Sequence, residues 1–287
     1  MNTIESTLTS KPKYVDLLGK EQALKLLHVF ADIESGKYDK NEIHTFKLNG
    51  ISHPIHLRAI RADMQSFVNT FIDVYLDKKP YLTDATFVID AGANIGYTAV
   101  LFANYWPQCK IISIEPDKEN YELSLKNTSP YSNITVLNGG LWNKEVKLRI
   151  EAGQEDGFVV REVNDSQTQI KSENLTSGIS IDQLLKKYNI AQIDFLKMNI
   201  EGSEKEIFAE NYKTWLPKTK AMLIELHDGK NAGCSKTVFA TINQYDFAVA
   251  ETAPYGALFG KESVDRKWYA DWYREESDKP KIDKTRF

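Results

Sequence analysis

The stretch VIDAGANIGYTAVLF, from Val88 to Phe102, joins an apolar run to a helical pattern through a turn that contains two glycines. Glycine loses much conformational entropy on folding, so Gly92 and Gly96 indicate a special dihedral angle or a close approach of the backbone. The order along the chain is strand, acidic residue, glycine turn and helix N-terminus. Because ligands bind at the carboxyl ends of strands in open parallel sheets, we expect this turn to contact a ligand.

From Thr86 onward, strand-like and helix-like segments alternate. Such alternation requires crossover connections, so it predicts an α/β fold with a parallel sheet covered by helices on both faces. The predicted strands are residues 86–90, 110–116, 133–139, 193–200, 221–227 and 246–252. The predicted helices are residues 95–106, 117–127, 181–189 and 234–245, with one more that begins at a capping box on Ser203. Residues 147–153 and 158–163 are an added β excursion, and residues 164–177 a polar loop.

Residues 1–80 predict an N-terminal cap made of helices and a β-hairpin. Residues 13–35 and 62–76 have helical periodicity, and Asn49-Gly50 between two short apolar segments is a strong hairpin signal. We expect three parts: this extension, a ligand-binding domain over residues 81–265, and a charged tail over residues 266–287. The tail carries Trp268, Tyr269, Trp272 and Tyr273. This aromatic stripe favours a docking or homodimer contact over a platform for a sugar or base.

Composition excludes several classes of partner. The 287-residue chain has a formal net charge of −4, which gives no general attraction to nucleic acid or to anionic lipid. No segment approaches the roughly 18 apolar residues of a membrane span. The two cysteines, Cys109 and Cys234, are too few and too far apart for a metal cluster, and they indicate a reduced, cytoplasmic protein.

The glycine turn favours one class of ligand. The spacing from Gly92 to Gly96 lacks the middle glycine of a dinucleotide-binding motif, and Asp90 would place a carboxylate beside the phosphates. Both features fit instead a cationic ligand whose own carboxylate meets backbone N–H groups.

The ends of the next two strands extend this interpretation. Glu115 ends the second strand, where its two oxygens can accept both hydroxyls of a ribose, and Asn138 near the end of the third can meet an adenine edge. An amino acid, a sulfonium and an adenosine together describe S-adenosylmethionine. The alternative is that Asp90 and Glu115 only cap helices. The predicted cofactor-binding residues are Asp90, Gly92, Asn94, Gly96, Glu115 and Asn138.

Five segments together resemble the FkbM family of methyltransferases, over about residues 55–260. They are LRAIRADMQSFVNTFIDVY (57–75), VIDAGANIGYTA (88–99), IEPD (114–117), GISIDQLL (178–185) and DFLKMNIEGSE (194–204). The resemblance implies a class I methyltransferase (Rossmann-like) fold, with a seven-stranded, mostly parallel sheet and a reversed final hairpin. It also implies S-adenosylmethionine as methyl donor and a hydroxyl as acceptor, on a small molecule such as a sugar or secondary metabolite. The family usually has an Asp where this chain has Asn199, which removes one charge.

The acceptor side is expected at the ends of the next two strands. Lys197, Asn199 and Glu201 alternate, so they share one face of a strand. The predicted catalytic residues are His227, Glu201 and Lys197. His227 is the expected general base, because an imidazole titrates near neutral pH, and Glu201 would orient it or bind the acceptor. The alternative for Lys197 and Glu201 is a neutralised pair that only stabilises the sheet.

Three alternatives remain at this stage. A divalent cation bound by Glu201, Glu225 and Asp228 could replace the base. Because Asn199 stands where the family usually has an aspartate, that site has one negative charge fewer, and we favour a metal-free route. The chain could be an NAD(P)-dependent oxidoreductase, which the glycine spacing disfavours. It could also be a non-catalytic protein with the same fold, which only Asn199 supports.

Overall fold

The strand that precedes the glycine turn, β3 (Phe87–Ala91), lies at the centre of a seven-stranded sheet. The computed structural model describes residues 12–37, 39–73, 84–152, 158–163, 171–252 and 256–261. The strand order is β12-β13-β11-β10-β3-β4-β5. The other strands are β4 (Lys110–Glu115), β5 (Ile134–Asn138), β10 (Ile193–Met198), β11 (Thr219–Ile224), β12 (Phe247–Thr252) and β13 (Gly256–Lys261).

Only the last strand of this sheet is reversed. The pairs from β5 through β4, β3 and β10 to β11 are all parallel, whereas β13 pairs antiparallel with both β11 and β12. The predicted parallel sheet is therefore confirmed, together with the reversed final hairpin implied by the family resemblance. The strand β13 has no counterpart in the strand pattern read from the sequence.

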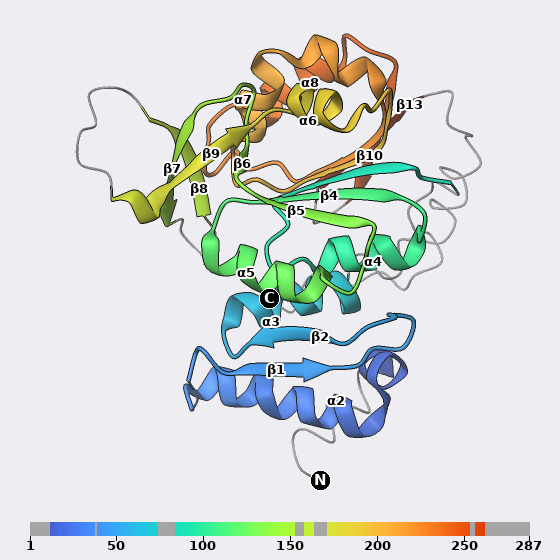
Figure 1. The fold of residues 1–287 in the computed structure, drawn as a ribbon, viewed down its shortest axis with the longest axis vertical. Helices are drawn as coiled ribbons and strands as arrows, with labels where there is room; N and C mark the ends of the chain where they lie inside the picture. The colour runs from blue at the N-terminus through green and yellow to red at the C-terminus, as the bar shows by residue number, and fades with distance from the viewer. Residues whose placement is uncertain are drawn as a thin grey trace, which may run out of the picture.

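Helices cover both faces of the sheet, as the alternating pattern predicts. The helices α4 (Tyr97–Tyr105) and α5 (Lys118–Thr128) lie on one face. The helices α6 (Ile181–Tyr188), α7 (Glu204–Ala209) and α8 (Cys234–Ile242) lie on the other (Figure 1). Neighbouring residues of β3 divide between the faces: Val88 packs with Phe102 of α4, and Ile89 packs with Leu184 of α6. Because side chains alternate along a strand, a strand buried on both faces must be apolar at nearly every position.

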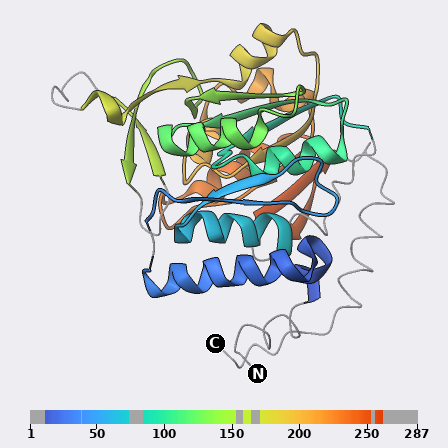
Figure 2. The ribbon, with the colours of Figure 1, turned by 60° about the horizontal axis from the view of Figure 1, so that its bottom comes forward.

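The N-terminal cap packs on α4 and α5. It consists of α2 (Pro12–Ser35), β1 (Ile43–Phe46), β2 (Ile55–Arg58), α3 (Arg61–Phe67) and the π-helical turn η1 (Val68–Asp73). Figure 2 shows α3 alongside α2. Its apolar core continues into α4 through Tyr97 and Val100. The buried Asn127 of α5 accepts a hydrogen bond from His56 N (2.7 Å) and donates one to Ile95 O (2.8 Å).

The predicted hairpin forms, but its loop is longer than the tight turn expected at Asn49-Gly50. The strand β1 ends at Phe46 and β2 begins at Ile55, and the two pair antiparallel. Asn49 binds α2 instead of closing a turn: its N–H donates to Leu17 O and its side-chain amide to Asp16 O, both at 2.7 Å. A tertiary contact therefore replaces the local turn.

The predicted β excursion belongs to a second, four-stranded sheet. Its order is β6 (Gly140–Leu141), β9 (Leu175–Ile179), β7 (Lys147–Ala152) and β8 (Phe158–Glu162). Antiparallel pairing of β7 with β8 confirms the excursion. The prediction of a loop over residues 164–177 is wrong at the C-terminal end of that range, because strand β9 begins at Leu175. Its sequence LTSGI is weakly β-forming, so the pairing with β7 decides the conformation.

The helix predicted to begin at Ser203 does so, but without the predicted capping box. No side chain caps α7, and Ser203 Oγ has no hydrogen-bond partner within the part of the chain that the structure describes. A capping box occurs instead at the start of α6, between Ser180 and Gln183. The tail with Trp268, Tyr269, Trp272 and Tyr273 lies outside the described residues. Within the described ranges, every helix is too short or too polar to span a bilayer.

Gly92 brings the turn after β3 against the end of β10. Its φ is +74°, and a Cβ built on it would overlap the Asn199 carbonyl oxygen and lie 2.8 Å from the carbonyl carbon. The Asn199 N–H in turn donates to Ala91 O at 3.0 Å. The fold itself, before any ligand, therefore requires glycine at this position.

We expect Gly92→Ala to destabilise the protein by more than about 4 kcal/mol, because overlap with a backbone adds to the strain of a positive φ. Gly50 is the matched control, since its φ is +80° and a Cβ there would meet nothing within 4 Å. Gly50→Ala should therefore cost only about 1–2 kcal/mol. Denaturant unfolding of both variants measures the difference, and equal losses would show that the contact with Asn199 is unimportant.

Candidate active site

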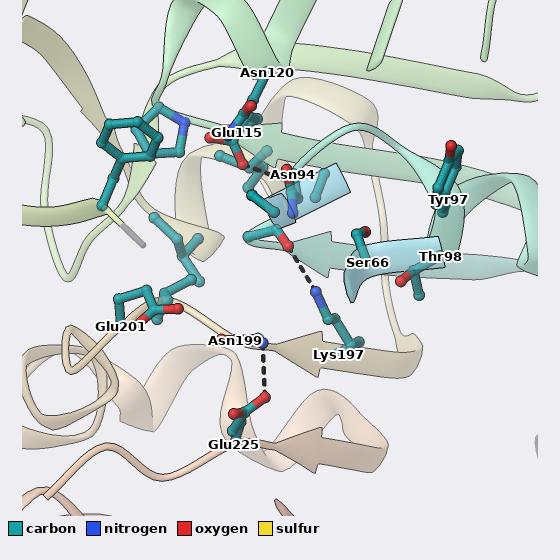
Figure 3. A pocket seen from close by; sticks show the side chains of 18 of the residues that line it. Ser66, Asn94, Tyr97, Thr98, Glu115, Asn120, Lys197, Asn199, Glu201 and Glu225 are labelled. Atoms are coloured by element: carbon teal, nitrogen blue, oxygen red, sulfur yellow. Dashed lines mark hydrogen bonds between the residues drawn. The ribbon is translucent and has the colours of Figure 1, made fainter. Parts of the chain in front are cut away.

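A cavity of about 660 Å³ opens at the carboxyl ends of β3, β4, β10 and β11 (Figure 3). Its walls include the strand ends with the turns that follow them, the start of α4, the cap elements α3 and η1, and strands β6 and β8 of the smaller sheet. Among the predicted site residues, six line this cavity: Gly92, Asn94, Glu115, Lys197, Glu201 and His227. The sheet therefore brings most of them together from segments more than a hundred residues apart.

The glycine turn forms one end of the cavity. The N–H groups of Gly92 and Ala93 both donate to Ile114 O at 3.0 Å, which ties the turn to β4. Gly96, with φ +86°, precedes α4, and no side chain caps that helix. Its first-turn residues Tyr97 and Thr98 line the cavity. The uncapped N-terminus thus presents backbone N–H groups and partial positive charge on this side.

Glu115 lies beside this turn and is almost completely buried. Its Oε2 accepts a hydrogen bond from Asn94 N (2.7 Å), and its Oε1 accepts one from Asp117 N (3.0 Å). Burial raises the pKa of Glu115 to about 7, although both backbone hydrogen bonds favour the ionised form. Each carboxylate oxygen retains a further lone pair, so Glu115 can accept two more hydrogen bonds.

Asp90 and Lys197 form a buried ion pair behind the turn. Lys197 Nζ lies 3.1 Å from Asp90 Oδ1 and donates to Gly92 O at 2.7 Å. Burial raises the pKa of Asp90, and the charge of Lys197 opposes that rise. Asp90 is fully buried and does not line the cavity. Its predicted contact with a cationic ligand is therefore not found, because Lys197 already neutralises it.

Two more predicted ligand residues, Gly96 and Asn138, do not line the cavity. Gly96 faces α5, where a Cβ would lie 3.1 Å from Thr128 and 3.3 Å from Ser124, so it permits the close packing of two helices. The Asn138 side-chain amide donates to Glu115 O (3.0 Å) and Pro116 O (3.1 Å). It holds the chain after β4, and Glu115 with it, in place.

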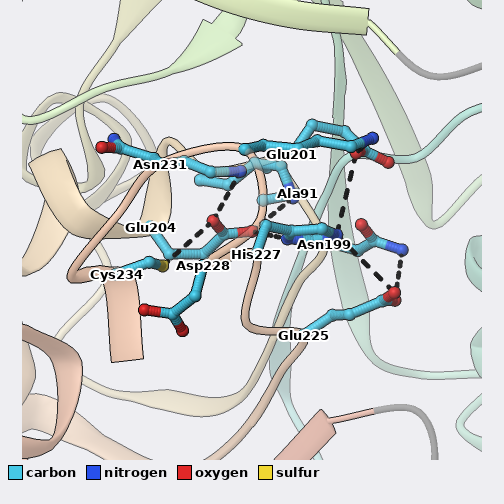
Figure 4. Close-up of polar contacts among 12 residues, drawn as sticks. Ala91, Asn199, Glu201, Glu204, Glu225, His227, Asp228, Asn231 and Cys234 are labelled. Carbon is cyan, nitrogen blue, oxygen red and sulfur yellow. Dashed lines mark hydrogen bonds and ion pairs between the residues drawn. The ribbon is translucent and has the colours of Figure 1, made fainter. Parts of the chain in front are cut away.

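The other end of the cavity is a cluster of charged and amide groups at the ends of β10 and β11 (Figure 4). Asn199 Nδ2 donates to Glu225 Oε2 at 2.7 Å, and Glu201 forms an ion pair with Lys230. His227 Nε2 lies 3.6 Å from Glu225 Oε1 and 3.7 Å from Glu201 Oε2. Two carboxylates therefore face the cavity, each held by a donor.

Comparison with known proteins assigns this arrangement to a family. Residues 90–250, more than half of the chain, match the model of the methyltransferase FkbM domain. The chain belongs to the FkbM methyltransferase family. A protein named Methyltransferase 1 from Beauveria bassiana is 24% identical over 203 residues, which cover 64% of this chain and 80% of that protein. The family resemblance read from the sequence is thus confirmed, and with it methyltransferase activity as the class of function.

Solved methyltransferase structures are similar only at low identity. Precorrin-6y C5,15-methyltransferase from Geobacter metallireducens is 10% identical, with a TM-score of 0.36 over 63% of this chain and 80% of that chain. Fibrillarin from Aeropyrum pernix, solved with bound S-adenosyl-L-methionine, is 12% identical, with a TM-score of 0.37 over 67% of this chain and 70% of that chain. The FkbM methyltransferase described here has the class I fold, to which the strand order and the reversed β13 correspond.

The surroundings of His227 in this FkbM methyltransferase do not fit the predicted base. Its Nδ1 lies 3.0 Å from Glu204 Oε1, on the side opposite the cavity carboxylates. Burial alone would lower the pKa of His227, but Glu204, Glu225 and Glu201 raise it to about 10. A histidine with that pKa is already protonated at neutral pH, so it cannot accept the proton of an acceptor hydroxyl.

The three residues considered as alternative metal ligands, Glu201, Glu225 and Asp228, do not lie together. Asp228 turns away from Glu201 and Glu225, and its carboxylate accepts hydrogen bonds from Ser235 N at 3.1 and 3.3 Å (Figure 4). Among the described residues, no three His, Cys, Asp or Glu side chains are arranged to hold a metal ion.

The sequence did not predict the wall of the cavity that the cap of this methyltransferase supplies. Polar side chains on α3 and η1 line it: Arg61, Gln65, Ser66, Asn69 and Thr70. Residues 61, 65 and 69 recur every four positions, opposite the apolar face that contains Phe67 and Phe71. This polar stripe was a readable signal, but a polar helix face is usually only solvated, and the sequence alone does not show that it faces a cavity.

We expect Lys197→Met to destabilise this methyltransferase by about 3–5 kcal/mol, because Asp90 would remain as an unpaired buried carboxylate. Adding Asp90→Asn should recover part of the loss. Lys118→Met is the control, since Lys118 pairs with Glu122 on the exposed surface of α5 and should cost at most about 1 kcal/mol. Denaturant unfolding would compare the wild type, Lys197→Met, Asp90→Asn, their double variant and Lys118→Met, and strictly additive losses for Lys197 and Asp90 would contradict the coupling.

Proposed function

We propose that this protein is an S-adenosylmethionine-dependent O-methyltransferase that acts on a hydroxyl of a small molecule, such as a sugar or secondary metabolite. One observation carries the proposal: a single cavity joins the glycine turn and Glu115 to the carboxylates of Glu201 and Glu225. The first end has the groups that a donor with a carboxylate and a ribose requires. The second has groups that can bind a hydroxyl and take its proton.

The residues at the first end, together with Asn199 where the two ends meet, fit the donor. The uncapped N-terminus of α4 suits its carboxylate, and Glu115 suits its ribose hydroxyls. Asn199 Oδ1 is buried without a hydrogen-bond partner within the described ranges, and Asn199 lines the cavity. Because Glu225 binds the amide nitrogen of Asn199, the orientation of that amide is fixed and its oxygen is left to accept from an ammonium group. When bound, the donor supplies a methyl group activated by its sulfonium.

The second end supplies the proton acceptor that His227 cannot be. The Glu225 side chain lines the cavity and is 35% exposed, so an acceptor can reach it. Asn199 holds its Oε2, and His227 lies near its Oε1. As the acceptor oxygen takes the methyl group that the donor would supply, leaving S-adenosylhomocysteine, Glu225 would accept the hydroxyl proton and pass it to water. The remaining task of the walls is to align the two reactants.

Donor binding tests the first end, with calorimetry using S-adenosylhomocysteine and, separately, NAD⁺. We expect S-adenosylhomocysteine alone to bind, about tenfold or more weakly in Glu115→Gln. Because the pKa of Glu115 is about 7, wild-type affinity should fall from about pH 8 to about pH 6 as the carboxylate is protonated, and Glu115→Gln should not show this fall. Glu122→Gln, on the exposed face of α5, is the control. Selective binding of NAD⁺ would refute the proposal.

Methyl transfer tests the second end. Tritium-labelled S-adenosylmethionine would be offered with glucose, glucuronate, myo-inositol or catechol. For a methylated compound, Glu225→Gln should lower kcat by about 10²–10⁴-fold and leave S-adenosylhomocysteine affinity unchanged. Glu210→Gln, exposed at the end of α7, should have no effect. Wild-type kcat in Glu225→Gln would exclude Glu225 as the proton acceptor.

A further inference from the structure

Glu204 is a fully buried carboxylate that lies behind the cavity and does not line it. Its Oε1 accepts a hydrogen bond from Ile200 N (2.9 Å), and its Oε2 accepts one from Gly202 N (2.8 Å). The same side chain meets His227 Nδ1 at 3.0 Å. One acidic group therefore holds both the turn after β10 and the histidine after β11.

The turn that Glu204 holds has an unusual backbone. Glu201 has φ +60° and Gly202 has φ +101°. A non-glycine residue rarely adopts this left-handed conformation, and it persists only where the surroundings enforce it. Besides the two hydrogen bonds to Glu204, Asn231 Nδ2 donates to Gly202 O at 2.9 Å. These contacts aim the Glu201 side chain into the cavity, where it lines the wall.

His227 links the buried Glu204 to the second cavity carboxylate, Glu225. With Nδ1 directed at Glu204, the opposite ring nitrogen, Nε2, is directed at Glu225 and Glu201 (Figure 4). A protonated imidazole has a donor on each nitrogen, so it can bridge a buried carboxylate and two cavity carboxylates at once.

The charges around His227 favour this protonated bridge. Glu201 and Glu204 approach from the turn after β10, and Glu225 from the end of β11. Its own loop carries Asp228 and Lys230, and α8 carries Cys234; Lys230 is paired with Glu201, and Asp228 with the start of α8. The three carboxylates near the ring outweigh one cation that is already paired. A pKa of about 10 for His227 agrees with this geometry.

We propose that Glu204 and His227 form a buried positioning pair, which fixes the positions of the Glu201 and Glu225 carboxylates at the acceptor end of the cavity. The assignment rests on the proposed function, because it explains how a carboxylate, rather than an imidazole, meets the acceptor hydroxyl. Glu204 acts only through His227 and the turn, and touches no reactant.

Nitrogen-15 NMR tests the pair without an acceptor. The His227 ring signals, assigned with His227→Gln, should show a protonated ring in the wild type to well above neutral pH. In Glu204→Gln the midpoint should fall by at least about one unit, because the carboxylate closest to the ring is removed. The side-chain amide signals of Asn199, which binds Glu225, should shift as well. Glu206→Gln, on the same helix but directed elsewhere, should change neither signal.

The outcomes separate the two proposals. A wild-type His227 midpoint near its ordinary value of 6.5, or an unchanged midpoint in Glu204→Gln, would overturn the positioning pair. If Glu204→Gln does not fold, Glu225→Gln on the cavity wall replaces it, and an unchanged His227 midpoint there would equally overturn the pair. Failure of the wild type to bind S-adenosylhomocysteine would instead count against the proposed function. For a methylated acceptor, Glu204→Gln should lower kcat by about a hundredfold with donor affinity preserved; unchanged kcat would refute positioning.

Discussion

The close approach of the Gly92 turn to the end of β10 is the constraint on which the cavity depends. Lys197 Nζ reaches across from β10 to the Gly92 carbonyl, and Asn199 N–H donates to Ala91 O. These contacts join the two central strands at the point where their chains diverge to opposite faces of the sheet. Because Gly92 has no side chain, Asn199 can lie against the turn, and one cavity can contain residues from both strands.

Electrostatics divide this cavity into two unlike ends. At the first end, Lys197 neutralises Asp90 behind the turn, so the cavity wall presents backbone N–H groups and Glu115 rather than the Asp90 carboxylate. At the second end, the carboxylates of Glu201 and Glu225 remain in the wall, and cations hold them there. The histidine that the sequence offers as a base is held in this second end by the carboxylates of Glu204, Glu225 and Glu201, which raise its pKa. Its chemistry therefore follows from its neighbours and not from its ordinary pKa.

The sequence was sufficient for every strand of the sheet except β13, because its signals are local. The apolar run of β3, the two glycines and the acidic residues at strand ends each fall within a few positions, and periodicity places them on elements. Hydrogen-bond partners are not local. Asn138 and Glu115 both lie at strand ends, yet Asn138 binds two backbone carbonyls outside the cavity. Ser203 and Glu206 have capping-box spacing, but the buried Glu204 between them takes the backbone N–H groups of the preceding turn instead.

Asn199 shows how such a partner changes the meaning of a residue. The family resemblance implies an aspartate there, and the asparagine is the only support for the alternative of a non-catalytic protein. In this structure the Asn199 amide lies 2.7 Å from the Glu225 carboxylate. Two carboxylates at that distance cannot both remain ionised, since like charges so close raise the pKa of one of them. An amide donates to Glu225 instead and leaves it free to accept a proton. With Glu225 opposite, asparagine at position 199 is therefore compatible with the proposed role of Glu225.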